Sequence, residues 1–140
     1  HLTDQGILLL KHEGIGKKGF LWSPPGGGIE SNENARTALI REFKEETHFD
    51  IVVEDFCFAN EYLDKQVHAL ELFFSVRVIG GYLKLGRDPE LKKQILTQAD
   101  YLSFEQVNQL HKLNKHNAFQ LCSDAAYINK LRGYYFFKNI

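Results

Sequence analysis

Three glutamates lie close together in the sequence REFKEE, the first of them fourteen residues after the last glycine of PPGGG. At about 100° per residue of a helix, Glu42, Glu45 and Glu46 fall within an arc of roughly 100°. Like charges this close weaken a helix by about a few tenths of a kcal/mol per pair. A divalent cation removes that repulsion, because compact sets of oxygen ligands suit Mg²⁺ or Mn²⁺. The spacing therefore predicts a metal site, to which the glycines at 26–28 could supply a carbonyl ligand.

The segments around the glutamates predict an α/β protein. Runs of β-branched and aromatic residues indicate strands, and Ser103 with Gln106 forms a capping box that indicates a helix start. We expect strands over 6–12, 20–22 and 51–63, a hairpin over 68–86 turning at Gly80-Gly81, and helices over 33–47, 104–113 and 118–131. The strands are mostly hairpin-linked and alternate irregularly with helices. This order favours an α/β sandwich with a mixed sheet over a doubly wound parallel sheet.

The composition suits a single domain without a charged or membrane partner. The chain has 140 residues, of which 44% are hydrophobic and 25% charged, and a formal net charge of -1. A charge so near zero gives no electrostatic attraction to nucleic acid or to an anionic membrane. Apolar runs stay well short of the roughly 18 residues that a membrane helix needs. The distant Cys57 and Cys122 are expected as reduced thiols, and we expect a cytoplasmic protein.

A second glycine pattern is set aside. Gly14, Gly16 and Gly19 spell G-x-G-x-x-G after a strand, as in dinucleotide-binding turns. That motif needs a helix directly behind it, whose N-terminus faces the pyrophosphate. FLWSPP follows instead, and its prolines prevent a helix from starting there. We expect a loop.

Residues 27–49 resemble the Nudix box, G-x5-E-x7-R-E-U-x-E-E-x-G-U, where U is a bulky apolar residue. The matching positions are Gly27, Glu33, Arg41, Glu42, Phe43, Glu45, Glu46 and Phe49. His48 stands in place of the second glycine, and Phe43 in place of the more usual aliphatic residue. GILLLKHE, LWSPPGGGIE and DYLSFEQV resemble the segments around the box, so the similarity covers most of residues 6–113. Family members usually have one more strand before GILLLKHE, so within a single domain over 1–140 we expect a truncated N-terminal strand.

The resemblance implies a Nudix-type α/β/α sandwich that hydrolyses a nucleoside diphosphate linked to another group, by attack of water on phosphorus. Glu42, Glu45 and Glu46 would then bind the divalent ions (Mg²⁺ or Mn²⁺), with the carbonyl of Gly26 as a weaker candidate ligand. Arg41 would orient these carboxylates and form a salt bridge with Glu33 that fixes the loop onto the helix. The general base stays open between Glu42 and a loop acid, for which Glu90 and Asp100 are the candidates.

The substrate class also has alternatives. HALELFF and GRDPE are most similar to the branch that acts on ADP-ribose or related nucleoside diphosphate derivatives. One alternative is a nucleoside triphosphate pyrophosphohydrolase. Another is a Nudix-fold module that senses a nucleotide without cleaving it, although such modules typically lose box carboxylates that this chain keeps. The expected partner is a small-molecule nucleotide, and a homodimer through YYFF or the strands stays open.

A few other side chains have two interpretations. Glu71 either points into the cleft or faces water at a strand edge, and the two are about equally supported. Trp22 is expected in the core rather than stacked on a base. His111 and His116 are five residues apart, which is wrong for a helical metal pair, so we expect both on the surface. His48 should follow the end of the glutamate helix in a left-handed conformation, which histidine tolerates better than most residues.

Overall fold

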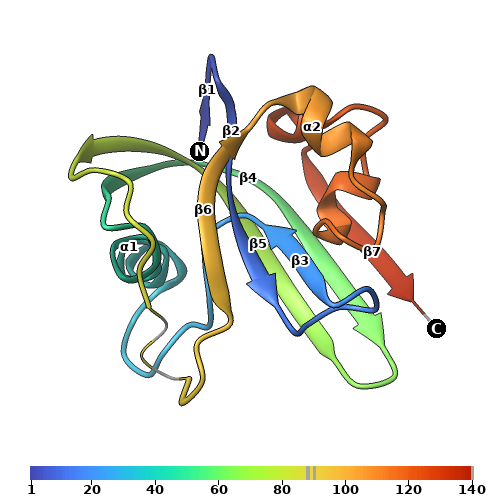
Figure 1. The fold of residues 1–140 in the computed structure, drawn as a ribbon, viewed down its shortest axis with the longest axis horizontal. Helices are drawn as coiled ribbons and strands as arrows, with labels where there is room; N and C mark the ends of the chain where they lie inside the picture. Colours follow the sequence, from blue (N-terminus) through green and yellow to red (C-terminus); the bar gives the residue numbers. More distant parts are fainter. Residues whose placement is uncertain (88, 90, 140) are drawn as a thin grey trace.

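The computed structural model describes residues 1–87, 89 and 91–139 (Figure 1). In chain order its elements are β1 (Leu2–Thr3), β2 (Gly6–Glu13), β3 (Phe20–Ser23), α1 (Ala35–Thr47), β4 (Asp50–Asp64), β5 (His68–Gly80), β6 (Leu96–Leu102), α2 (Phe104–Gln109), the 3₁₀ helices η1 (Asn117–Gln120) and η2 (Ala125–Lys130), and β7 (Gly133–Asn139). Within this described part, no helix has the length and apolar character needed to cross a membrane.

The strands form two sheets. In the first, β2 is central and pairs antiparallel with β1, β3 and β6. In the second, β4 is central, pairing antiparallel with β5 and parallel with β7. The α/β class with a mixed sheet is thus confirmed, although the mixed pairing is confined to the second sheet. In Figure 1, α1 lies on one side of the sheets, while α2 and the C-terminal segments lie on the other.

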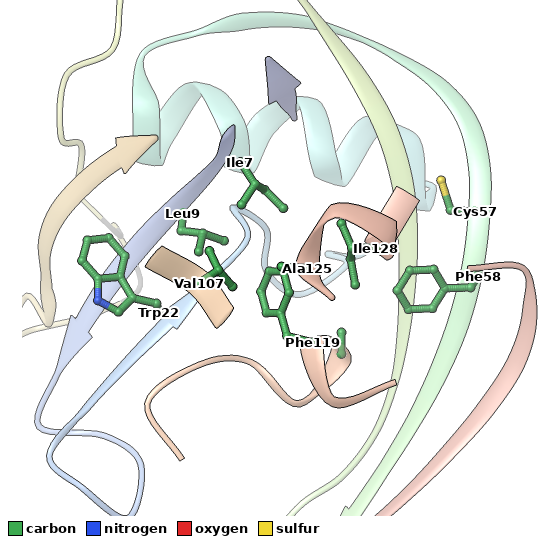
Figure 2. Close-up of a cluster of buried hydrophobic side chains, with 10 residues drawn as sticks. Ile7, Leu9, Trp22, Cys57, Phe58, Val107, Phe119, Ala125 and Ile128 are labelled. Atoms are coloured by element: carbon green, nitrogen blue, oxygen red, sulfur yellow. The ribbon is translucent and has the colours of Figure 1, made fainter. Parts of the chain in front are cut away.

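Strand β2 has a core on each of its faces. Successive side chains of a strand point to opposite faces, and here Ile7 and Leu9 enter one cluster while Leu8 enters the other. The larger cluster packs the C-terminal segments against the sheets (Figure 2) and includes Trp22, Phe58, Val107, Phe119 and Ile128. The second cluster packs α1 through Phe43, with Phe49, Ile51 and Val76. The expectation that Trp22 belongs to the core is confirmed, and both cysteines are free thiols.

Helix α1 begins and ends at residues whose side chains or backbone suit a cap. The Asn34 side chain accepts hydrogen bonds from the N–H groups of Arg36 and Thr37, so the helix starts two residues later than predicted. It ends at Thr47, and His48 follows with φ 61°, in the left-handed region. The predicted end of the helix and the conformation of His48 are confirmed.

Two predicted elements were wrong. Residues 68–80 form one strand, β5, whose hairpin partner is β4, so the turn lies before His68 and not at Gly80-Gly81. Residues 82–86 form no strand, because their backbone binds the end of α1 instead. The helix predicted over 118–131 is replaced by η1 and η2, since Asp124 caps η2 by accepting from the N–H of Ala126 and so interrupts the helix. Helix α2 begins with the predicted capping box but ends at Gln109, earlier than expected.

Candidate active site

The glycines at 26–28, called the glycine turn below, lie directly against the face of α1 that carries the three glutamates. The backbone N–H of Gly26 donates to Glu46 Oε2 at 3.0 Å. At Gly27 an added Cβ would come within 2.3 Å of Glu42 Oε1, so a side chain there would displace the carboxylate. The turn therefore approaches the helix as closely as backbone without side chains allows. These two contacts connect the glycines to two of the three glutamates predicted to bind metal.

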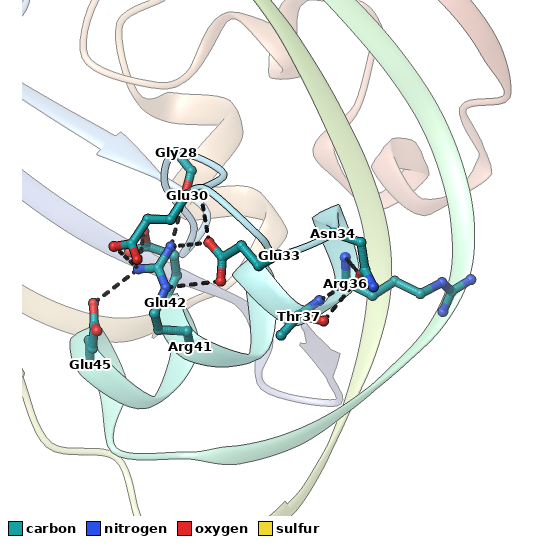
Figure 3. Close-up of polar contacts among 9 residues, drawn as sticks. All are labelled: Gly28, Glu30, Glu33, Asn34, Arg36, Thr37, Arg41, Glu42 and Glu45. Carbon is teal, nitrogen blue, oxygen red and sulfur yellow. Dashed lines mark hydrogen bonds and ion pairs between the residues drawn. The ribbon is translucent and has the colours of Figure 1, made fainter.

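Arg41 joins the turn to the glutamates (Figure 3). Its guanidinium bonds Glu33 twice, with Nη2 to Oε1 at 2.7 Å and Nε to Oε2 at 3.3 Å, which is the predicted salt bridge. Nη2 also donates to the carbonyl of Gly28 at 3.0 Å, and Nη1 donates to Glu42 at 2.9 Å and to Glu45 at 3.4 Å. One planar group with several donors therefore holds the loop and two carboxylates together.

These contacts change the protonation equilibria of the pair. The hydrogen bond from Arg41, followed by the backbone N–H of Glu30, lowers the pKa of Glu33 below its usual value. The hydrogen bond to Glu33 likewise raises the pKa of Arg41, helped by the hydrogen bond to Glu42. Both groups therefore stay ionised near neutral pH.

The three glutamates do not converge on one point. Within residues 1–87, 89 and 91–139, no three His, Cys, Asp or Glu side chains are gathered as a group that could hold a metal ion. Glu42 and Glu45 are turned to Arg41, whereas Glu46 is turned to Gly26. Glu42 and Glu46 are nevertheless buried, with 9% and 4% of their surface exposed. Two buried carboxylates beside a third on one helix face are a donor set of the hard-oxygen kind that suits Mg²⁺ or Mn²⁺.

The C-terminal end of α1 is fixed by residues 84–87, a contact that no local pattern in the sequence predicts. The N–H groups of Lys84, Gly86 and Arg87 donate to the carbonyls of Thr47, Glu46 and Glu45, at 3.1, 2.7 and 3.3 Å. These are carbonyls that a helix end leaves without partners. His48 adds a side-chain contact, since its Nδ1 donates to the carbonyl of Lys84 at 2.9 Å. The last turn, which carries Glu45 and Glu46, is thereby held in place.

A cleft of about 550 Å³ opens beside the glycine turn. Gly26, Gly27 and Gly28 line one part of it, and Ala69 to Phe74 of β5 line another. The same glycines thus contact both the cleft and the glutamates of α1. Glu71 lines the cleft, which decides between the two interpretations of this residue. His116 lines it too, so the surface position predicted for His116 was wrong.

The candidates for the general base are placed differently. Glu90 lies outside the described residues. Asp100 is exposed on β6, where it accepts from the N–H of Tyr101, and it does not line the cleft. Glu42 is the candidate that touches both Arg41 and the glycine turn.

A family model described as "NUDIX domain" matches residues 2–122. The chain therefore belongs to the Nudix family. A curated relative, the ADP-ribose pyrophosphatase of Methanocaldococcus jannaschii, is 36% identical over 87 residues, covering 61% of this chain and 51% of the relative. An uncharacterised Nudix hydrolase of Bacillus subtilis is 42% identical over 50 residues, or 36% of this chain and 29% of that protein. These matches span about half, or less, of the relatives' own length.

Solved structures of Nudix proteins share the fold. A Nudix hydrolase from Nitrosomonas europaea aligns with a TM-score of 0.75 at 18% identity, over 94% of this chain and 86% of that one. An ADP-ribose pyrophosphatase from Streptococcus suis aligns with a TM-score of 0.62 at 19% identity, over 96% and 92%. At these identities the likeness supports the α/β/α architecture alone.

Proposed function

We propose that this protein is a divalent-metal-dependent hydrolase that cleaves the diphosphate linkage of a nucleoside diphosphate derivative. The observation that carries the proposal is the set of three glutamates on one face of α1, joined by Arg41 and the glycine turn beside a cleft. Carboxylates gathered on one helix face repel one another, and Lys44, which stands between them in the sequence, pairs with Asp50 instead. A metal ion bound by these carboxylates would neutralise their charge and also the charge of a bound diphosphate. Metal binding therefore gives the cluster of carboxylates a function.

Glu42, Glu45 and Glu46 would hold the divalent ions, with the carbonyl of Gly26 as a further ligand. When bound, such ions neutralise phosphate charge and favour deprotonation of a water. Glu33 would keep the guanidinium of Arg41 in place through its two hydrogen bonds. Arg41 would then orient the carboxylates, while the glycine turn leaves room for the diphosphate. Glu42 is the base we propose, because it lies against Arg41 and Gly27, whereas Asp100 is exposed on β6.

ADP-ribose or a related derivative is the substrate that we favour. A curated relative with 36% identity is named ADP-ribose pyrophosphatase, and the cleft beside the glycine turn has a volume of about 550 Å³, within the ordinary range for a small-molecule site. A nucleoside triphosphate pyrophosphohydrolase would use the same glutamates. The substrates of the two hydrolases differ in the group that is attached to the diphosphate, so a panel of substrates distinguishes the two activities.

The test is a panel of ADP-ribose, other nucleoside diphosphate derivatives and nucleoside triphosphates, each with Mg²⁺ or Mn²⁺, with phosphate release measured after phosphatase coupling. The control is Glu46→Gln, which keeps the shape of the side chain and removes its charge. We expect metal-dependent turnover of ADP-ribose by the wild type and at least about a 10²-fold loss in the variant. Turnover of triphosphates alone would favour the alternative hydrolase. Tight nucleotide binding without any product would favour a sensing module.

A further inference from the structure

We propose that Glu71 is a specificity-determining residue, whose carboxylate accepts hydrogen bonds from the nucleoside part of the substrate. The inference rests on the proposed function, because it assigns one end of the substrate to one wall of the cleft. It concerns a group on β5 that lies outside the Nudix box and away from α1.

Three distant segments converge to hold Glu71 in the cleft wall. Asn60 of β4 is directly opposite Glu71 in the pairing with β5, and its Nδ2 donates to Glu71 Oε2 at 2.8 Å. His116 reaches Glu71 Oε1 through Nε2 at 3.0 Å. The backbone of His116 is itself fixed, because its N–H donates to the carbonyl of Trp22 in β3 at 2.8 Å. Two donors from separate elements therefore hold one carboxylate whose side chain remains 29% exposed.

The hydrogen bonds also define which partner donates. The N–H of Ala118 donates to His116 Nδ1 at 3.2 Å, so the ring hydrogen lies on Nε2 and points at Glu71. Burial favours the protonated form of Glu71, but the hydrogen-bonding and electrostatic contact with His116 and the hydrogen bond from Asn60 outweigh it and lower the pKa of Glu71. The carboxylate therefore faces the cleft as an anion that can accept further hydrogen bonds and cannot donate them.

This arrangement is poorly suited to a purely structural role. Asn60 is fully buried, and its Oδ1 has no hydrogen-bond partner among the described residues. A buried polar atom without a hydrogen-bond partner usually lowers the free energy of unfolding. Apolar side chains of similar size often stabilise a buried site as well as polar or charged side chains do. Phe58 and Phe73 stack beside the group, which shows that the same strands can pack apolar side chains. A ligand that uses the carboxylate accounts for its presence.

The charge of Glu71 selects the kind of group that it can bind. An anion in the cleft wall repels phosphate, so the diphosphate should lie elsewhere in the cleft. Carboxylates pair with N–H and O–H donors. In a nucleoside these are the amino group of the base and the hydroxyls of the ribose. The amino group and the hydroxyls would both donate a hydrogen bond to Glu71, and substrate analogues that lack one or the other distinguish them.

The test compares Glu71→Gln with the wild type. The Gln carbonyl can still accept from His116, and its amide can donate to the Oδ1 of Asn60 once that amide turns over, so folding should be preserved. The variant loses the charge and an acceptor. We expect the KM for ADP-ribose to rise at least about tenfold, equivalent to about 1.4 kcal/mol, with kcat changed less than about threefold.

Glu61→Gln is the matched control. Glu61 is also a hydrogen-bonded carboxylate on β4, bound to His68 and Tyr134. It neighbours Asn60 in the strand and so faces the other side of the sheet, and it does not line the cleft. Its removal should leave the KM unchanged. A rise in KM of equal size in both variants would overturn the proposal, because it would reflect a general effect on the strands.

Analogues identify the donor, and binding separates this inference from the proposed function. If Glu71 binds the amino group of the base, Glu71→Gln should change the KM of an analogue that lacks this amino group only a little. Deoxyribose analogues test the hydroxyls of the ribose in the same way. Calorimetry of adenosine binding requires neither metal nor turnover, because adenosine carries the nucleoside part without the diphosphate. A tenfold loss of affinity in Glu71→Gln supports the inference even if the wild type cleaves nothing, which would overturn the hydrolase proposal alone. Equal affinity of the two proteins, or no binding by the wild type, would overturn the inference.

Discussion

Gly86 is the position where a single methyl group should damage the end of α1. Its N–H donates to the carbonyl of Glu46 at 2.7 Å, and an added Cβ would lie 1.7 Å from the carbonyl oxygen of Glu45. Both of these groups belong to backbone, so no flexible side chain can move aside. In Gly86→Ala the segment must therefore withdraw from the helix by more than about an ångström, given ordinary van der Waals separations.

The magnitude follows from the hydrogen bonds that this withdrawal breaks. Lys84, Gly86 and Arg87 each donate one backbone N–H to the last turn of α1. A net contribution of about 0.5–1.5 kcal/mol for each gives a loss of roughly 2–4 kcal/mol in the free energy of unfolding. For a domain of this size that loss lowers Tm by about 6–15 °C. Metal affinity should fall as well, because the same turn carries Glu45 and Glu46.

Denaturant unfolding measures the loss, and Gly28→Ala is the matched control. Neither glycine has a positive φ, and at Gly28 a Cβ would meet no described atom within 4 Å. Alanine there should be neutral or should stabilise by about 0.4–1 kcal/mol, because it restricts the unfolded chain. If Gly86→Ala were as stable as Gly28→Ala, the segment would not cap α1 as described, and the argument about the last turn would fail.

Three further predictions concern the helix and its caps. Glu46→Gln should lose at least about 10²-fold in turnover, while its unfolding midpoint stays near that of the wild type; a large drop in the midpoint would mean a structural role. His48→Ala should be less stable than His48→Gly by about 1 kcal/mol in denaturant melts, because both lose the bond to Lys84 but only alanine keeps a Cβ at positive φ; equal stabilities would contradict the left-handed assignment. The lowered pKa of Glu33 means that its contribution is present above the unfolded pKa of about 4.3 and is lost as pH falls through the folded value. Melts across pH should therefore show Glu33→Gln less stable than the wild type at pH 7, with a difference that shrinks as the pH falls below about 4.3, and a constant difference would show that the charge of Arg41 is not involved.

Features that depend on nearby residues could be predicted from the sequence. The glutamate stripe follows from helical periodicity, and the capping box at Ser103 follows from a spacing of three residues. The end of α1 and the left-handed His48 follow from the box pattern and from the conformational cost of a side chain there. Strand β2 was predicted within one residue at its end, because a run of buried aliphatic residues has few other structures open to it.

Features that depend on distant pairing could not be predicted. His116 enters the cleft because its backbone pairs with Trp22, more than ninety residues earlier, and nothing local to KHNAF indicates this. Residues 82–86 have the composition of a strand, but their N–H groups bind α1. The start of α1 was predicted two residues too early for a local reason. The sequence alone does not distinguish Asn34 as the N-cap from Asn34 as a residue of the first helical turn. A signal for Glu71 did exist, because an acid at a strand position between apolar neighbours is unusual, but it does not say which face is buried.

The two sets of carboxylates suggest how a substrate would be oriented in the proposed complex. Those of α1 lie beside Arg41 and would be neutralised by metal, so that end of the site attracts a diphosphate. Glu71 keeps its negative charge, so it repels phosphate and accepts from hydroxyl or amino groups. A substrate with an anionic centre and a hydrogen-bond-donating end then has a preferred direction in the cleft. The reverse direction would place phosphate against Glu71 and the donating end beside the metal ions proposed at α1, so the difference in charge between these two places would set the orientation.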